Sequence, residues 1–333
     1  MTVLFQNNIL PIYDKYHLKC NSILVELFQQ CNLACEFCCS IDESGKRATK
    51  FDKDTILSFI PLIKRTLPYA DQSSKFGICV LGGELYQDRF DYSVYDTFYK
   101  QLNEITTGYN CFIYTFSNMI FNDRDRVYDL LSSNNIRLNA SFDLVGRYPK
   151  QKYLEKAIDN ILWFADRPIG DSLFNVCLIA NRPNMENIIN HGINLQYFDI
   201  LYNHPNIAIN FGDYLPVENK LQYIPDDKLI IEFYKHLYDH YPRVQDLQDL
   251  FHHKKKHRCN EIYITQTGVE QWHCSTLTNT YINYKNNFYN TLHCFQCPYF
   301  KQCAQMCYKS YYNRKACWKK VIYDRISNSN QIG

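Results

Sequence analysis

The sequence predicts an α/β protein with a sheet of parallel βα units, and three observations support this class. Short apolar runs rich in β-forming residues recur between residues 22 and 211, and turn residues bound them. Helical patterns lie between these runs. A chain of 333 residues can bury one large core or two modest ones. Strands that alternate with helices favour about six parallel units, in an open sheet or a partial barrel.

The expected elements follow one another in a regular order along the chain. The predicted strands are SILVELF (22–28), FGICVL (76–81), CFIYTF (111–116), IRLNASF (136–142), FNVCLIA (174–180) and NIAINF (206–211). Helices are predicted at 54–67, 94–105 and 153–165. Each of these helices lies between two successive strands, as a parallel sheet requires.

Polar or glycine-rich residues follow four successive predicted strands. CNLACEFC follows the first, GGE (82–84) the second and SN (117–118) the third, while S-F-D (141–143) ends the fourth. Strand ends often carry turn residues, and for SN alone that interpretation is favoured. In βα barrels, however, active sites collect at the C-terminal ends of the strands. The four signals together favour a barrel with one site at its mouth.

The cysteine content points to metal rather than to disulfides. The chain has 15 cysteines and no visible export signal, and disulfide frameworks belong mainly to small secreted domains. Reduced cysteines in clusters more often bind metal. The spacing C-x3-C-x2-C supplies three thiolates from one loop, namely Cys31, Cys35 and Cys38, with Cys39 as a surplus thiol. An iron–sulfur cluster is favoured over zinc and over unligated cysteines.

Composition bounds the remaining functions. The formal net charge of +2 indicates no strong nucleic-acid or membrane partner. The chain has no apolar run of 18 residues, so no membrane span is expected. The N-terminus lacks a basic start and a small-residue cleavage site, so it does not resemble a signal peptide. We therefore expect a cytoplasmic protein.

Two of these motifs resemble those of radical S-adenosylmethionine (SAM) enzymes. CNLACEFC resembles the family signature C-x3-C-x2-C, including the aromatic Phe37, and GGE resembles the motif that binds the SAM amine. The resemblance covers about residues 22–215 and implies a partial (β/α)6 TIM-type barrel. Where many relatives have T-N-G and S-x-D-G, this chain has Ser117-Asn118-Met119 and Ser141-Phe142-Asp143-Leu144.

The resemblance implies a specific chemistry. The three thiolates hold three irons of a 4Fe–4S cube, and the fourth iron binds SAM. An electron from the cluster then cleaves SAM to methionine and a 5′-deoxyadenosyl radical, which abstracts a hydrogen atom. Glu84 would supply a carboxylate for the SAM ammonium. The implied SAM contacts are Gly82, Gly83, Glu84, Ser117, Asn118 and Ser141.

A second group of seven cysteines lies near the C-terminus. Seven thiols exceed one tetrahedral site, and two zinc ions or two clusters both fit the count. The group resembles the SPASM domain over residues 259–317, although its first part reads C-x8-G-x5-C, one residue displaced from the usual spacing. The resemblance implies two auxiliary 4Fe–4S clusters, and thus three clusters in all. The nearer is expected on Cys259, Cys274 and Cys307, and the farther on Cys294, Cys297, Cys303 and Cys317.

One ligand position of the nearer auxiliary cluster stays open. Some relatives fill it with an extra cysteine, and His253 stands there in this chain. A solvated basic stretch is the favoured interpretation of HHKKKHRC, so an open iron is the default. The expected domains are an N-terminal extension (1–20), the partial barrel (21–215), a helical linker (216–250) and the SPASM domain (251–333).

The resemblance implies a peptide maturase that makes an oxidative cross-link, losing two hydrogens in a C–C, C–S or C–O bond. Sulfatase-type oxidation of Ser or Cys is less favoured, because Ser275 replaces the expected Asp base. The sequence also fits a SPASM-type small-molecule dehydrogenase or epimerase, or a non-enzymatic metal protein. Only 30 residues precede Cys31. We therefore expect that a separate protein binds the leader, or that the barrel and SPASM surface bind the precursor peptide directly. Flavodoxin or ferredoxin is the expected electron donor, and no catalytic side chain is identified.

Overall fold

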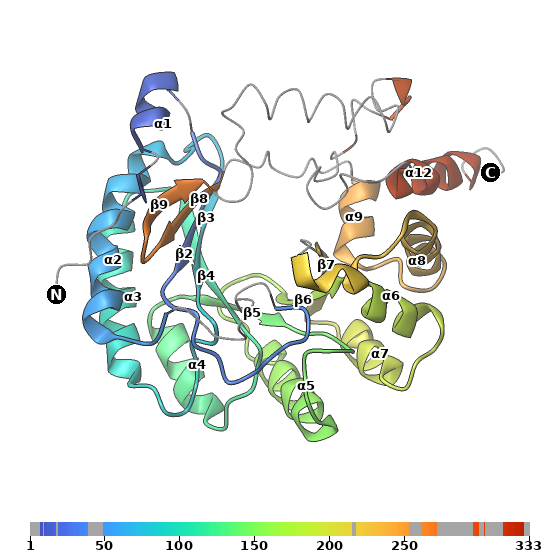
Figure 1. Cartoon of the computed structure of the whole chain (residues 1–333), viewed down its shortest axis with the longest axis horizontal. Coiled ribbons are helices and arrows are strands. Elements are labelled where there is room, and N and C mark those ends of the chain that lie inside the picture. The colour runs from blue at the N-terminus through green and yellow to red at the C-terminus, as the bar shows by residue number, and fades with distance from the viewer. Residues whose placement is uncertain are drawn as a thin grey trace.

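The computed structural model describes residues 7–8, 10–17, 19–38, 49–214, 218–252, 261–271, 296–299, 303 and 316–329. A curved sheet lies at its centre, with helices along the outer side (Figure 1). Among the described residues, no helix combines the length and apolarity needed to cross a bilayer.

Six consecutive strands of this sheet are parallel, and each pairs with the next along the chain. They are β2 (Ser22–Glu26), β3 (Phe76–Leu81), β4 (Cys111–Ser117), β5 (Arg137–Ser141), β6 (Phe174–Ala180) and β7 (Ile207–Asp213). All six predicted strands are therefore confirmed, with ends that differ by two residues at most. The α/β class and the partial TIM-type barrel are confirmed as well.

The helices between the strands begin mostly at side-chain caps. Asp52, Asp91 and Asp123 each accept a backbone N–H in the first turn of the helix that follows, which satisfies a donor the helix itself cannot. The barrel helices are α2 (Lys53–Thr66), α3 (Tyr92–Thr106), α4 (Arg124–Ser133), α5 (Gln151–Ala165), α6 (Arg182–Ile189) and α7 (Leu195–Asn203). The predicted helices correspond to α2, α3 and α5.

Further elements flank the barrel. Figure 1 shows α12 beside α8, on the same side of the molecule as α6 and α7. These elements are α1 (Leu10–Tyr16), η1 (Leu67–Tyr69), η2 (Glu218–Tyr223), α8 (Asp227–His240), α9 (Gln245–Phe251) and α12 (Trp318–Ser329).

Three strands that the sequence did not predict extend the sheet beyond β2, in the order β1-β9-β8-β2. They are β1 (Asn7–Asn8), β8 (Glu261–Thr265) and β9 (Gly268–Gln271). β8 lies parallel to β2, and Tyr263 donates a 2.6 Å hydrogen bond to Glu26 across this pair. β8 and β9, which fall within the range expected for the SPASM domain (251–333), thus belong to the barrel sheet. The domain boundaries themselves stay predictions.

The two faces of the sheet differ in burial. Along β6, Phe174, Val176 and Leu178 are buried beneath the helices, and the Phe174 ring lies 6.3 Å from that of Phe164 in α5. The alternate residues, such as Asn175 and Cys177, are only half-buried and face the concave side. Along β6, the concave face therefore has polar groups and accessible surface that the helix-covered face lacks.

Candidate active site

The three N-terminal cysteines lie in the loop that follows β2. Cys35 is buried, Cys31 and Cys38 are half-buried, and none of them is in a disulfide. All three pack in one small apolar cluster with Leu33, Phe37 and Tyr214. The loop therefore holds its thiols partly away from water, at the C-terminal end of the first barrel strand.

Nitrogen donors lie close to two of these sulfurs. The backbone N–H of Leu33 lies 3.4 Å from Cys31 Sγ, and Asn118 Nδ2 lies 3.8 Å from it. Arg147 Nη1 lies 3.9 Å from Cys35 Sγ. Donors and a positive charge favour the thiolate over the thiol, and the thiolate is the form that binds metal. The surroundings of this loop thus fit an anionic iron–sulfur cluster.

The geometry differs from that of a single-ion centre. Among the residues the structure describes, no three Cys, His, Asp or Glu side chains could hold one metal ion together. In a 4Fe–4S cube each cysteine thiolate binds a different iron, so the three cysteine sulfurs need not converge on one point. The assignment of Cys31, Cys35 and Cys38 as cluster ligands stays a prediction.

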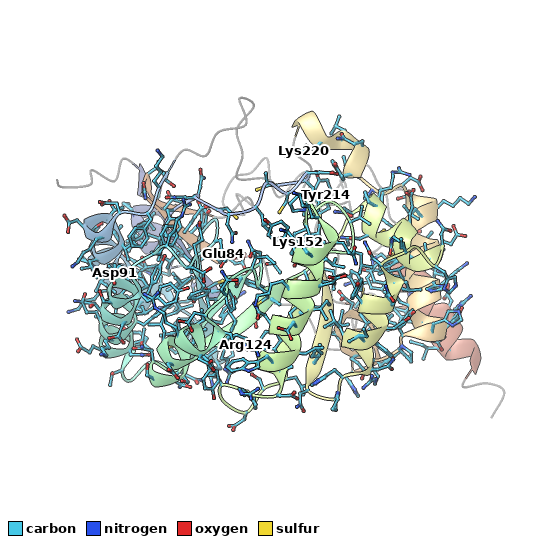
Figure 2. All side chains as sticks on the ribbon, turned by 90° about the horizontal axis from the view of Figure 1, so that it is seen from below. Glu84, Asp91, Arg124, Lys152, Tyr214 and Lys220 are labelled. Atoms are coloured by element: carbon cyan, nitrogen blue, oxygen red, sulfur yellow. The ribbon has the colours of Figure 1, made fainter. Side chains whose placement is uncertain are left out.

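Glu84 joins the ends of β3 and β4. Its side chain is 2% exposed, and Figure 2 shows it well inside the molecule. Its Oε1 accepts hydrogen bonds from the Tyr86 N–H (3.0 Å) and the Ser117 hydroxyl (2.9 Å), and Oε2 accepts the Asn118 N–H (2.6 Å). Burial raises the pKa of this carboxyl, and these hydrogen bonds oppose the rise. Three of the expected SAM contacts, Glu84, Ser117 and Asn118, are therefore brought together.

Gly83 brings the GGE turn against the cysteine loop. Its N–H donates to the Phe28 carbonyl at 2.8 Å, and the Glu84 N–H donates to the Gln30 carbonyl at 3.0 Å. A Cβ on Gly83 would lie 2.1 Å from the carbonyl oxygen of Gln29. The glycine is thus required for the contact between two protein segments, a role that the sequence did not reveal. At Gly82, a Cβ would meet only the Leu85 side chain closely.

Asn118 connects this region to the cysteine loop. Its Nδ2 donates to Asn32 Oδ1 at 2.8 Å, and its Oδ1 accepts the Ile120 N–H at 2.9 Å. The Tyr148 hydroxyl donates to the Asn118 carbonyl at 3.2 Å and lies 3.5 Å from the Ser141 carbonyl. The half-buried Ser141, at the end of β5, thus lies next to the same group.

Asp143 is more than a turn residue, because it forms a buried ion pair with Arg147. The distance from Arg147 Nε to Asp143 Oδ2 is 2.7 Å. Burial raises the pKa of the Asp143 carboxyl, and Arg147 opposes the rise. Neither Arg147 nor Tyr148 was predicted from the sequence. The i, i+4 spacing of Asp143 and Arg147 was the one available signal for the ion pair.

Three of the C-terminal cysteines are described. Burial raises the pKa of the Cys303 thiol to about 11, and the neighbouring Cys317 and Cys297 add to the rise. Cys297 and Cys317, two further predicted ligands of the farther auxiliary cluster, are therefore close enough to Cys303 to influence its charge. Cys259, Cys274, Cys294 and Cys307 lie outside the described residues, as do Cys39, His253 and Ser275.

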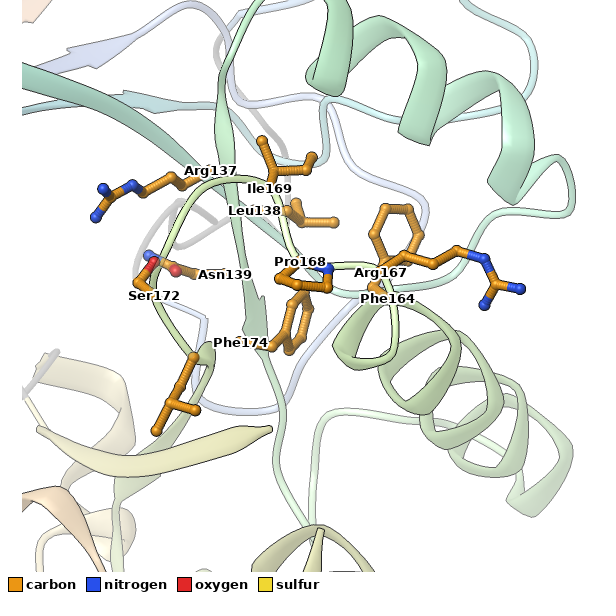
Figure 3. A pocket seen from close by; sticks show the side chains of 10 residues that line it. Arg137, Leu138, Asn139, Phe164, Arg167, Pro168, Ile169, Ser172 and Phe174 are labelled. Carbon is orange, nitrogen blue, oxygen red and sulfur yellow. The ribbon is translucent and has the colours of Figure 1, made fainter. Parts of the chain in front are cut away.

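The pockets lined by described residues include two on the barrel. One of 360 Å³ borders the cysteine loop, and its lining includes Asn32, Asp88, Lys152 and Lys156. The other, of 20 Å³, lies where β5 and β6 begin, as the positions of Arg137 and Phe174 show (Figure 3). This second pocket is at the opposite strand ends from Ser141 and the candidate site.

The fold resembles those of known peptide-bound and SAM-bound structures. Native anSMEcpe with bound AdoMet and Cp18Cys peptide matches with a TM-score of 0.63 and 16% identity, over 94% of this chain and 99% of that one. SuiB from Streptococcus suis bound to S-adenosylmethionine matches with a TM-score of 0.53 and 12% identity, over 93% and 78%. SuiB bound to the precursor peptide SuiA matches with 0.51 and 13%, over 92% and 76%.

No protein-family model and no curated protein matches the chain. Both anSMEcpe and SuiB bind S-adenosylmethionine in these structures, and the fold expected from the CNLACEFC and GGE motifs is confirmed. At these identities the likeness establishes the fold alone.

Proposed function

We propose that the chain is a radical SAM enzyme of the SPASM type that modifies a ribosomally made peptide. The observation that carries this proposal is the network centred on Glu84 and Asn118. It links the ends of β3 and β4 to the cysteine loop after β2 through hydrogen bonds of 2.6 to 2.9 Å. Cysteine, GGE and SN signals that lie far apart in the sequence thus meet at one end of a parallel barrel, where active sites of such folds lie.

In this proposal the chain's residues bind and orient the cofactors. Cys31, Cys35 and Cys38 hold a 4Fe–4S cluster, and the cluster and SAM together supply hydrogen-atom abstraction when bound. The proposed SAM site consists of Gly82, Gly83, Glu84, Ser117, Asn118 and Ser141.

Glu84 has acceptor capacity left for the SAM ammonium. A carboxylate offers about four lone-pair sites, and the described hydrogen bonds from Tyr86, Ser117 and Asn118 occupy three of them. The remaining site on Oε2 would accept the ammonium as a charge-assisted hydrogen bond. The Gly83 and Glu84 N–H groups donate to the Phe28 and Gln30 carbonyls, so the backbone that carries this carboxylate is held and little reorganisation accompanies binding.

The proposed substrate is a precursor peptide. Two of the matching structures contain a peptide, which supports this substrate class. We propose that the enzyme forms an oxidative cross-link in this peptide, with loss of two hydrogens. Ser275 stands where sulfatase-type oxidation would need an Asp base, which disfavours that alternative. The second electron would pass to auxiliary clusters held by the C-terminal cysteines. The proximity of Cys297, Cys303 and Cys317 supports one of these clusters.

The remaining parts of the proposal are a flavodoxin or ferredoxin as electron donor, a separate leader-binding protein and a cytoplasmic location. The donor and the location follow from the chemistry, because a low-potential electron and reduced thiols are needed.

The test is co-expression with any short open reading frame found beside the gene, followed by mass spectrometry of the encoded peptide. We expect a product lighter by two hydrogen atoms, with backbone fragmentation suppressed between the joined residues. A variant with Cys31, Cys35 and Cys38 replaced by Ala should give none. Cys111→Ala, a matched cysteine change on β4 outside the site, should retain the product. A wild-type yield from the triple variant would refute the radical site, and unsuppressed fragmentation would point to side-chain oxidation instead.

A further inference from the structure

The loop that follows β5 packs directly on the cysteine loop. The Glu36 N–H donates to the Gly146 carbonyl at 2.9 Å. Gly146 has a φ of +79°, and a Cβ there would lie 3.3 Å from atoms of Glu36 and Phe37. A left-handed glycine is therefore what allows these two loops to meet. Arg147, the next residue, is held at this junction.

Arg147 is held by a fixed carboxylate. The side chains of Arg147 and Asp143 are 12% and 0% exposed, and the two ion-pair atoms are 2.7 Å apart. Asp143 also accepts the Ile179 N–H at 2.8 Å and a hydrogen bond from the Asn184 amide. Asn184, itself fully buried, accepts the Leu144 N–H at 3.0 Å. Side-chain and backbone donors thus fix Asp143, which in turn fixes the guanidinium.

The other side of the guanidinium faces the cysteine loop. Its Nη1 lies 3.9 Å from Cys35 Sγ, and its central carbon lies 5.6 Å from the centre of the Phe37 ring. The guanidinium therefore bonds Asp143 through Nε and lies against the sulfur through Nη1. Well-packed apolar residues can often replace a buried ion pair without loss of stability. Stability alone does not account for a buried charge directed at a thiol.

We propose, resting on the radical SAM function above, that Arg147 is a positioning residue that sets the reduction potential of the cluster bound through Cys35. On reduction the cluster takes up one electron, passing from the 2+ to the 1+ state, and a low-potential donor of the ferredoxin or flavodoxin class supplies it. A nearby positive charge and an N–H directed at sulfur stabilise the added negative charge, which raises the potential. Asp143 moderates this effect because its own charge is opposite.

The test is a redox titration of the reconstituted holoenzyme, followed by electron paramagnetic resonance. The signal that changes when SAM is added belongs to the cluster on Cys31, Cys35 and Cys38, which separates it from other clusters. Arg147→Gln should shift its midpoint potential to more negative values. Asp143→Asn, which leaves the Arg147 charge uncompensated, should shift it to more positive values. Arg124→Gln removes an arginine from a solvent-exposed ion pair with Asp159 and should leave the potential unchanged.

The paired variants distinguish tuning from structural damage. If Arg147 had only a structural role, Arg147→Gln and Asp143→Asn should shift the midpoint potential in the same direction, or both should lose the cluster, measured as iron content. Arg147→Lys keeps the charge and should retain most of the wild-type potential, and it carries the test if Arg147→Gln does not fold. An unchanged potential in Arg147→Gln with a weaker SAM affinity would overturn the inference and make Arg147 a SAM contact. Absence of any SAM-responsive signal in the wild type would instead overturn the proposed function.

Discussion

Gly83→Ala should separate the structural role of the GGE turn from its ligand role. The added Cβ would lie 2.1 Å from the Gln29 carbonyl oxygen and 2.4 Å from that of Gln30. Both neighbours are backbone atoms, so the two segments must move apart. The hydrogen bonds from Gly83 N–H to Phe28 and from Glu84 N–H to Gln30 are then lost. At about 0.5–1.5 kcal/mol each, their loss lowers the free energy of unfolding by about 1–3 kcal/mol.

The assay is urea denaturation of Gly83→Ala with Gly82→Ala as the matched control. At Gly82 the Cβ would meet Leu85 Cδ2 at 2.5 Å, so one buried side chain must shift, but no two backbone segments need to separate. Gly82→Ala should therefore lower the free energy of unfolding clearly less than Gly83→Ala does. If Gly83→Ala changes the free energy of unfolding by less than about 0.5 kcal/mol, Gly83 is not required for this backbone contact, since changes of that size are usual for surface positions. Equal destabilisation by both variants would also refute the reasoning.

Three further predictions concern the cofactors and a buried thiol. Glu84→Gln should weaken SAM binding about tenfold to a hundredfold in calorimetry, because a charge-assisted hydrogen bond of about 1.5–3 kcal/mol is lost, and an unchanged affinity would exclude that contact. Iron analysis of protein prepared without oxygen should give about twelve irons per chain, and four would rule out the auxiliary clusters. Burial raises the pKa of the Cys20 thiol from 9.0 to about 12, so the unfolded state loses its proton first and stability falls as pH rises between these values. Cys20→Ala should flatten this fall in pH-dependent denaturation, and an unaltered slope would contradict it.

Sequence patterns predicted the parallel strands because local periodicity specifies them. The run FNVCLIA alternates buried and half-buried positions along β6, and its bounds were predicted to the residue. By contrast, α6 begins with Arg182 and Pro183 and has only eight residues, which leaves too few turns for a periodic signal.

The pairings over long sequence distances could not be predicted. Arg147 lies 112 residues from Cys35, and Ser22 lies 239 residues from Glu261. No local pattern identifies such partners, because they depend on which loops the folded barrel brings together. The motif residues of the site were found because their chemistry is unusual. Arg147 has an ordinary side chain in an ordinary loop, and only its contacts distinguish it.

The parallel pairing of β8 with β2 also affects how the protein is made. Ser22 to Val25 on β2 pair with Glu261 to Ile264, so the ribosome must add 239 residues before this edge of the sheet is covered. At about 5–20 residues per second, the first barrel strand remains uncovered for roughly ten to fifty seconds. An uncovered edge strand is a template for pairing with another chain. The nascent polypeptide therefore presents such an edge, directly before its cysteine loop, throughout the synthesis of the barrel.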